Sequence, residues 1–210
     1  MSKHITLKGS YNEDPNIVEI GIDEAGRGAL AGPVTIAACI MPHGFAHPLI
    51  KDSKLLSEKE RQEAVAIIQA NAVAWNVQHV SVDLIEEMNI LKATMKGMYD
   101  SLKYLDEHAH RFDHILVDGD QFHGYHGVPY TTVVGGDNKY TSIAAASILA
   151  KTSRDNLMKD LSKDLMEYGW GSNKGYGTKQ HTDAIKEHGK TPHLRHSFIS
   201  HMLTKTSQLF

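Results

Sequence analysis

The sequence predicts an α/β fold in which helices flank a mixed five-stranded sheet. Five short apolar segments of strand length occur among longer segments in which apolar residues recur at helical spacing. The first six elements follow the order strand–strand–helix–strand–helix–strand, which is typical of a mixed sheet. The chain of 210 residues is 41% hydrophobic, so it can bury a core of its own.

The first two strands should pair as an antiparallel hairpin, because only a short turn joins them. Residues 24–33 hold three glycines and one proline, a composition typical of a turn. A helix should begin at Ser57, since Ser57 and Glu60 have the spacing of a capping box. The predicted strands are 17–23, 34–40, 73–80, 114–119 and 130–134, and the predicted helices are 57–72, 82–110 (one broken or two abutting helices), 140 to past 165, and 178–187.

Three segments divide the chain into regions. Residues 1–16 are polar and are expected to form a flexible N-terminal arm. Residues 17–168 carry all five strands and should form one domain. Residues 169–177 hold four glycines and should be a loop, so residues 169–210 are expected to form a C-terminal loop and helical appendage.

Composition excludes several classes of protein. Cys39 is the single cysteine, so there is no disulfide scaffold. The N-terminus lacks a secretory signal and no run of about 18 apolar residues is present, so we expect a cytoplasmic protein with no membrane association. The net charge of −3 argues against a non-specific nucleic-acid coat protein, but not against an enzyme with a local basic face.

Acidic residues occur where predicted strands end. Asp23 ends the first strand, Asp118 ends the fourth and Asp137 follows the fifth, while Glu24 adjoins Asp23. Sites in α/β sheets gather beyond the carboxyl ends of strands, and clustered carboxylates require cations to neutralise them. Glu24 can join Asp23 only if the strand has already broken, because neighbouring strand residues point to opposite faces. Taken singly, each acid could equally be a surface or capping residue; together they suit Mg²⁺ or Mn²⁺.

The turn Gly26-Arg27-Gly28 would expose backbone N–H and C=O groups without side chains in the way. Such a backbone can bind a hydroxyl or phosphate at close range, although a tight hairpin alone explains the same residues.

Taken together, several blocks resemble one family, ribonuclease HII, the type 2 ribonuclease H. The blocks occur in the family's order between residue 21 and about residue 198. They are Gly21-Ile22-Asp23-Glu24-Ala25-Gly26-Arg27-Gly28 with Ala31-Gly32-Pro33, Lys51-Asp52-Ser53-Lys54-Leu55-Leu56, Val117-Asp118-Gly119, Gly136-Asp137-Asn138-Lys139-Tyr140 running into Ile143 to Lys151, Arg154-Asp155, and Gly175-Tyr176-Gly177-Thr178.

The resemblance implies a ribonuclease H-like fold and a metal-dependent endonuclease. Such enzymes hydrolyse the RNA strand of RNA–DNA hybrids and nick 5′ to single ribonucleotides in duplex DNA, leaving 3′-hydroxyl and 5′-phosphate ends. Two metal ions, Mn²⁺ or Mg²⁺, act in the reaction. By resemblance, the metal ligands are Asp23, Glu24, Asp118 and Asp137.

The resemblance also implies which residues bind the substrate. The backbone of Gly26, Arg27 and Gly28 would read the ribose 2′-hydroxyl, which distinguishes RNA from DNA. Tyr176 would stack on the next, deoxy, sugar, and Ser53 with Lys54 would hold a backbone phosphate. Further candidates for phosphate contact or for support of the site are Lys139, Lys151 and Arg154; the last two, three residues apart on a helix, suit a phosphate track or a salt bridge equally.

Other features leave alternatives open. Residues 192–198 carry two histidines where the family has a more basic sequence, and the pairs His123/His126 and His193/His196 have the spacing of zinc ligands without a supporting frame. The C-terminal Gln208-Leu209-Phe210 could dock on a sliding clamp, although a frayed end is commoner. The protein is otherwise expected to be a monomer. Rival interpretations are another two-metal nuclease, such as a resolvase or integrase relative, and a non-catalytic hybrid-binding module.

Overall fold

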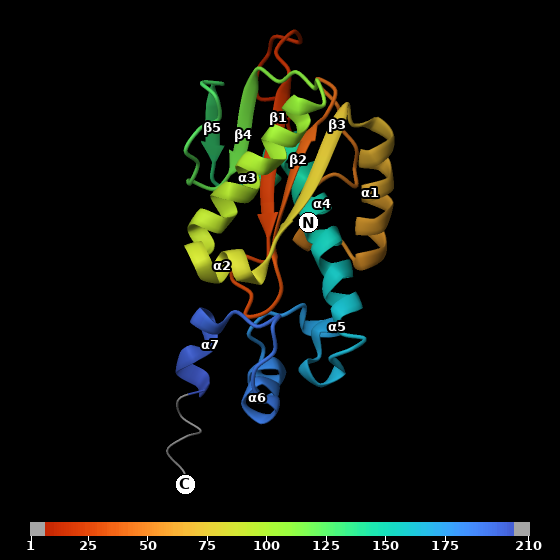
Figure 1. Cartoon of the computed structure of the whole chain (residues 1–210). Coiled ribbons are helices and arrows are strands. Elements are labelled where there is room, and N and C mark those ends of the chain that lie inside the picture. Colours follow the sequence, from red (N-terminus) through yellow and green to blue (C-terminus); the bar gives the residue numbers. More distant parts are fainter. Residues whose placement is uncertain (1–6, 204–210) are drawn as a thin grey trace.

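The computed structural model describes residues 7–203 and shows the predicted α/β architecture. A five-stranded sheet has the order β3-β2-β1-β4-β5. β1 is antiparallel to β2 and parallel to β4, and β4 is parallel to β5, so the sheet is mixed (Figure 1). The strands are β1 (Glu19–Ala25), β2 (Val34–Ile40), β3 (Ala74–Val80), β4 (His114–Asp118) and β5 (Tyr130–Val133).

Helices cover both faces of the sheet and one end of it. Helices α2 and α3 pack over one face, and α1 and α4 over the other. Helices α5, α6 and α7 lie together beyond the carboxyl end of β1 (Figure 1). The helices are α1 (Glu58–Asn71), α2 (Val82–Met88), α3 (Ile90–Glu107), α4 (Thr141–Leu161), α5 (Trp170–Asn173), α6 (Lys179–His188) and α7 (His196–Leu203).

Local sequence explains most of these boundaries. The predicted capping box is present, with Ser57 accepting from the Glu60 N–H at the start of α1. Asn89, with φ of 72°, ends α2 and caps α3, so the helical segment 82–110 is two abutting helices. The predicted loop 169–177 contains the short helix α5, and α7 forms where no element was assigned from the sequence.

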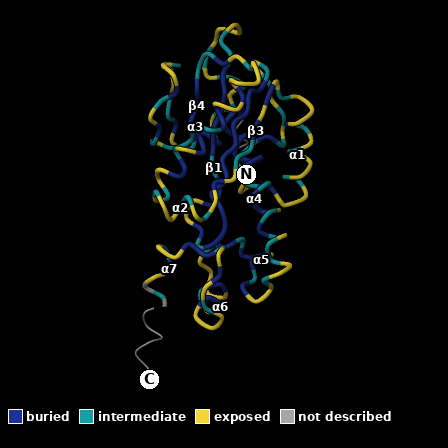
Figure 2. Tube along the Cα trace, viewed as in Figure 1, coloured by how far each residue is buried: buried dark blue, intermediate teal, exposed yellow. Residues whose placement is uncertain are grey.

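The central strands of the sheet are buried on both faces, which fixes the position of their ends. Every residue of β2 is buried, and α4 is buried along its first ten residues (Figure 2). The backbones of β1 and α4 approach each other closely at Gly21, where a Cβ would lie 2.2 Å from the Ser142 backbone carbon. A side chain at position 21 would therefore push α4 away from the strand that carries Asp23.

Of the expected N-terminal arm, residues 7–16 contact the start of α4 and β1, and residues 1–6 lie outside the described residues. Lys8 forms a parallel bridge with Tyr140, and the Lys8 N–H donates to the Lys139 carbonyl at 2.8 Å. The Tyr11 N–H donates to the Glu19 carboxylate at 2.9 Å. Within residues 7–203, no helix is long and apolar enough to cross a membrane.

Candidate active site

Two of the four candidate metal ligands are brought together by strand pairing. β1 and β4 are parallel neighbours in which Ile22 lies opposite Val117, so the next residues, Asp23 and Asp118, lie side by side. The Asp118 carboxylate also accepts the Gly136 N–H at 2.6 Å. This bond fastens the loop after β5 to the end of β4.

The third candidate ligand, Asp137, comes from that loop. It lies in a short 3₁₀ turn, Gly136–Asn138, where its side chain is buried and accepts from the Asn138 amide at 3.1 Å. Lys54 Nζ lies 3.8 Å from the other Asp137 oxygen. The loop thus holds Asp137 beside Asp118 and Lys54.

The fourth candidate, Glu24, reaches the site differently from the prediction. β1 does not break at Asp23; it continues to Ala25, with Asp23 opposite Ala37 and Glu24 opposite Ile36. Because neighbouring strand residues alternate, Asp23 faces α4 and Glu24 faces the other side of the sheet. Glu24 is nevertheless close enough for its charge to raise the pKa of Asp23, and it pairs with Arg27 at 3.3 Å.

Burial and mutual repulsion dominate the electrostatics of the acids. Burial raises the pKa of Asp23 well above its usual range, and the charges of Glu24 and Asp118 raise it further. Burial also raises the pKa of Glu24 and of Asp137, and the Asp118 charge adds to both. Buried carboxylates that repel one another are stabilised by a cation, and their hard oxygens suit Mg²⁺ or Mn²⁺.

The donor chemistry therefore fits divalent metal ions, although the acids do not form a finished cage. Among the described residues, no group of three or more acidic, histidine or cysteine side chains already surrounds one ion position. Side-chain rotation would be needed to draw the carboxylates onto a common ion.

The glycine turn begins directly after the acids of β1. It is a β-turn closed by the Ala29 N–H, which donates to the Gly26 carbonyl at 3.2 Å. Gly26 has a φ of 88°, and a Cβ there would lie 1.9 Å from Arg154 Nε. Gly28 is exposed, and a Cβ there would meet nothing within 4 Å. Packing therefore requires a glycine at position 26, whereas position 28 faces open space.

Arg154 supports this turn from inside the protein. Its guanidinium is buried and donates to the carbonyls of Pro33 at 3.0 Å, Ala31 at 2.9 Å and Lys174 at 2.9 Å. All three of its nitrogens are occupied, so the part of the prediction that gave Arg154 a phosphate contact does not match this geometry. Of its two predicted roles, support of the site is the one that fits.

Tyr176 follows a residue that is hydrogen-bonded to the end of the turn. The Gly175 carbonyl accepts the Leu30 N–H at 2.8 Å, which joins the Tyr176 loop to the end of the turn. The half-buried Tyr176 ring is 5.2 Å from the Arg154 guanidinium carbon and 5.8 Å from Lys151 Nζ. Tyr176 is therefore positioned to offer a ring face next to the turn.

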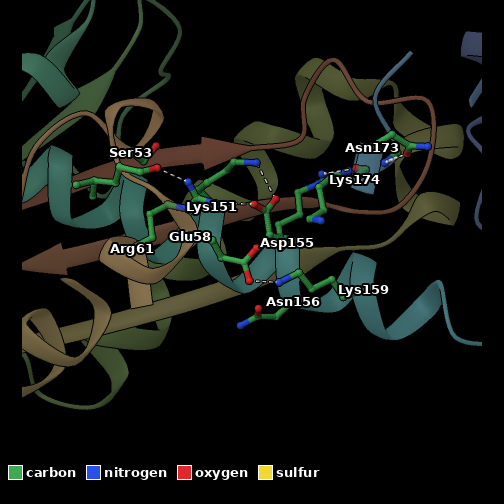
Figure 3. A network of polar contacts seen from close by, with 12 residues as sticks. Ser53, Glu58, Arg61, Lys151, Asp155, Asn156, Lys159, Asn173 and Lys174 are labelled. Atoms are coloured by element: carbon green, nitrogen blue, oxygen red, sulfur yellow. Dashed lines mark hydrogen bonds and ion pairs between the residues drawn. The ribbon is translucent and has the colours of Figure 1, made fainter. Parts of the chain in front are cut away.

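The remaining basic candidates have different surroundings. Lys151 pairs with the buried Asp155 at 2.7 Å, and Arg61 approaches the same carboxylate at 3.5 Å (Figure 3). Lys151 and Arg154 therefore do not form a phosphate track; the salt-bridge alternative holds for Lys151. The Lys54 side chain is 79% exposed and free to meet a phosphate, whereas Lys139 Nζ donates to the Val134 carbonyl at 2.8 Å.

Ser53 anchors the Lys54 segment rather than facing the solvent. It is buried, and its hydroxyl lies 3.2 Å from that of Ser147 on α4. Ser147 also hydrogen-bonds Asp23, so the Lys54 segment and the acids share one contact on α4.

Sequence reasoning missed one residue of this region, Arg195. It is fully buried and donates to the carbonyls of Gly32 at 2.9 Å and Arg27 at 3.0 Å. Burial and the neighbouring Arg154 charge lower its pKa. The one feature of the sequence that could have indicated its role is its position in residues 192–198, the stretch that departs from the family pattern.

Neither histidine pair forms a zinc site within the described part of the chain. His126 contacts the Tyr99 hydroxyl at 3.0 Å, and His193 packs edge-on against Trp170. The segment Gln208-Leu209-Phe210, predicted to dock on a sliding clamp, lies outside the described residues.

The amino-acid sequence matches one known family over most of its length. The sequence profile of Ribonuclease HII matches residues 20–202. The chain belongs to the ribonuclease HII family. Ribonuclease HII of Bacteroides thetaiotaomicron is 48% identical over 183 residues, covering 87% of this chain and 90% of that protein. Ribonuclease HII of Cytophaga hutchinsonii is 45% identical over 193 residues, covering 92% and 94%.

Solved structures show the same fold. Ribonuclease H2 from Pyrococcus horikoshii superposes with a TM-score of 0.75 at 21% identity, covering 91% of this chain and all of that one. A ribonuclease HIII in complex with Mn²⁺ gives a TM-score of 0.69 at 17% identity, covering 93% of this chain and 72% of that one. As a ribonuclease HII, the protein is a metal-dependent endoribonuclease that cleaves the RNA strand of RNA–DNA hybrids.

Proposed function

We propose that this ribonuclease HII also nicks duplex DNA on the 5′ side of a single embedded ribonucleotide. The observation that carries the proposal is the direct succession of acids and bare backbone: Asp23 and Glu24 are followed within four residues by the exposed Gly28. A sugar bound at the turn would place its neighbouring phosphate at the acids. One ribonucleotide is then enough to position the bond that is cut.

The four acids are the proposed ligands of two divalent cations. Bound Mg²⁺ or Mn²⁺ would supply a nucleophilic hydroxide and neutralise the leaving oxygen, giving 3′-hydroxyl and 5′-phosphate ends. Asp23 and Asp118 are fixed by strands, whereas Asp137 comes from a loop and is the ligand most dependent on bound substrate. Lys54 would hold a phosphate beside Asp137, because its charge already lies 3.8 Å from that carboxylate.

Tyr176 is proposed to contact the sugar that follows the ribonucleotide. Its ring lies beside the turn and is held from below by Arg154. A flat ring at that point suits a deoxyribose, which lacks a 2′-hydroxyl to solvate. The site would thus prefer an RNA–DNA junction over continuous RNA.

A labelled duplex with one ribonucleotide tests the proposal. The cut should map to the 5′ side of the ribonucleotide, require Mg²⁺ or Mn²⁺ and stop in chelator. The matched all-deoxy duplex should remain intact. Equal cleavage of both duplexes would instead support a general two-metal nuclease, as in a resolvase relative.

The C-terminal Gln208-Leu209-Phe210 is proposed to bind a sliding clamp. A structure of the PCNA:RNase HII complex from Archaeoglobus fulgidus is similar in fold, with a TM-score of 0.71 at 23% identity over 85% of this chain and 94% of that one. Deleting residues 206–210 should lower clamp affinity, measured by surface plasmon resonance, while leaving hybrid cleavage unchanged. Unchanged clamp affinity would reject the proposal.

A further inference from the structure

Arg195 is joined to the glycine turn by both its backbone and its side chain. Its N–H donates to the Leu30 carbonyl at 2.8 Å, and the His193 carbonyl accepts the Gly32 N–H at 2.8 Å. Its guanidinium then reaches back across the turn to the Arg27 carbonyl at 3.0 Å. The segment before α7 is therefore fastened along residues 27–32 rather than at one point.

The Arg27 carbonyl belongs to the one peptide group of this turn that can flip. In a β-turn, the central peptide has two orientations, types I and II, which differ by about 180° and cost little to exchange when glycine is the third residue. Here the central peptide joins Arg27 to Gly28. Gly28 does not have the positive φ that type II requires, so the turn is in the other state.

Binding the Arg27 carbonyl fixes the direction of the Gly28 N–H. A trans peptide is planar, and its C=O and N–H groups point in opposite directions. Arg195 lies in the interior and holds the carbonyl inward. The Gly28 N–H is thereby directed outward, where Gly28 is exposed and a Cβ would meet no atom within 4 Å.

The fold does not satisfy the whole Arg195 side chain, although its guanidinium carbon lies 5.4 Å from the centre of the Phe198 ring. Its Nη2 is buried without a hydrogen-bond partner, and it forms no ion pair with a carboxylate in residues 7–203. A buried cation with an unpaired N–H destabilises a fold relative to an apolar side chain of similar size. What the guanidinium does provide is two fixed donors for two carbonyls of the turn.

We propose that Arg195 is a positioning residue for ribonucleotide recognition: it locks the Arg27–Gly28 peptide so that the Gly28 N–H points at the sugar 2′-oxygen. This rests on the proposed function of the turn. Arg154 has a different role, because it binds the Pro33, Ala31 and Lys174 carbonyls and not the flipping peptide.

Binding without metal tests the role of Arg195 separately from cleavage. Fluorescence anisotropy in chelator gives the affinity for a duplex with one ribonucleotide and for the matched all-deoxy duplex. The readout is the ratio of the two affinities. Loss of one oriented hydrogen bond predicts that Arg195→Gln lowers this ratio by about five- to tenfold. Arg195→Lys keeps the charge but not the rigid fork, so its ratio should fall by about two- to threefold.

The control is Ile199→Ala, which removes apolar volume from the C-terminal core but, unlike Arg195→Gln, removes no hydrogen-bond donor to the turn. It should lower the melting temperature and keep the wild-type affinity ratio. A wild-type ratio in Arg195→Gln overturns the proposal, as does an equal loss in Ile199→Ala. If Arg195→Gln does not fold, a wild-type ratio in Arg195→Lys overturns it. A wild-type enzyme with no preference between the duplexes would instead refute the proposed function of the turn.

Discussion

Of two alanine substitutions in one turn, only one should destabilise the fold, although both should impair activity. Gly26 and Gly28 are separated by one residue, but their surroundings differ completely. Gly26 has a φ of 88° and lies against Arg154, whereas Gly28 has an ordinary φ and faces open space. Gly26→Ala should therefore unfold the region, and Gly28→Ala should fold like the wild type.

The structure sets the size of each effect. A non-glycine residue in the left-handed region costs about 1–2 kcal/mol. The new Cβ at position 26 would lie 1.9 Å from Arg154 Nε, so the guanidinium must leave its three carbonyl partners. Even one lost bond to a charged group costs about 1.5–3 kcal/mol. The loss of stability for Gly26→Ala is then at least about 2.5 kcal/mol, whereas Gly28→Ala should stay within about 0.5 kcal/mol.

Urea unfolding and cleavage assays separate the two substitutions. Gly28→Ala should keep the wild-type midpoint but lose about tenfold or more in kcat/KM on the single-ribonucleotide duplex, because its methyl group occupies the space left for the sugar. Gly26→Ala should lower both the urea midpoint and kcat/KM. A stable Gly28→Ala variant with full activity would refute the idea that this surface contacts the substrate. A stable Gly26→Ala variant would refute the packing argument.

Three further predictions concern the acids and Tyr176. Asp23→Asn and Asp118→Asn should each abolish metal-dependent cleavage. In chelator, both variants should melt at or above the wild-type temperature, because each substitution removes a repulsion between neighbouring carboxylates. Cleavage at the wild-type rate by either variant would disprove the ligand assignment. Burial raises the pKa of Asp23 and Asp137, so these groups favour the metal-free fold most at low pH and lose that contribution as the pH rises from about 4 through the raised values; in calorimetry, Mn²⁺ affinity should correspondingly fall as the pH is lowered through those raised values, since protons compete with the metal. Tyr176→Ala should reduce cleavage at a single ribonucleotide more than cleavage of a long hybrid, and equal losses on both would contradict its proposed sugar contact.

Local sequence signals predicted the parts of the site that local structure determines. The strands, the α1 capping box and the positions of Asp118 and Asp137 follow from short-range periodicity and from turn residues. Strand pairing then places Asp23 beside Asp118 without further information. The positions of these acids at strand ends can therefore be predicted from the sequence alone.

The errors arose where a contact depends on tertiary structure. Whether β1 ends at Asp23 or Ala25 depends on its pairing with β2, which a glycine-rich sequence does not reveal. For Arg154, the sequence left phosphate contact and support of the site as alternatives. Its real partners, the carbonyls of Pro33 and Ala31, lie more than 100 residues earlier in the chain, and a long side chain can reach them only after α4 has docked.

The way in which these groups are held implies that cleavage and recognition can be altered separately. Asp23 and Asp118 are fixed by the pairing of β1 with β4, which does not involve the segment around α5, α6 and α7. The glycine turn, by contrast, is held by Arg154 of α4 and by Arg195, which directly precedes α7. Substitutions around Arg195 should therefore lower the discrimination between ribose and deoxyribose before they lower metal binding, whereas substitutions of the strand-end acids should do the reverse.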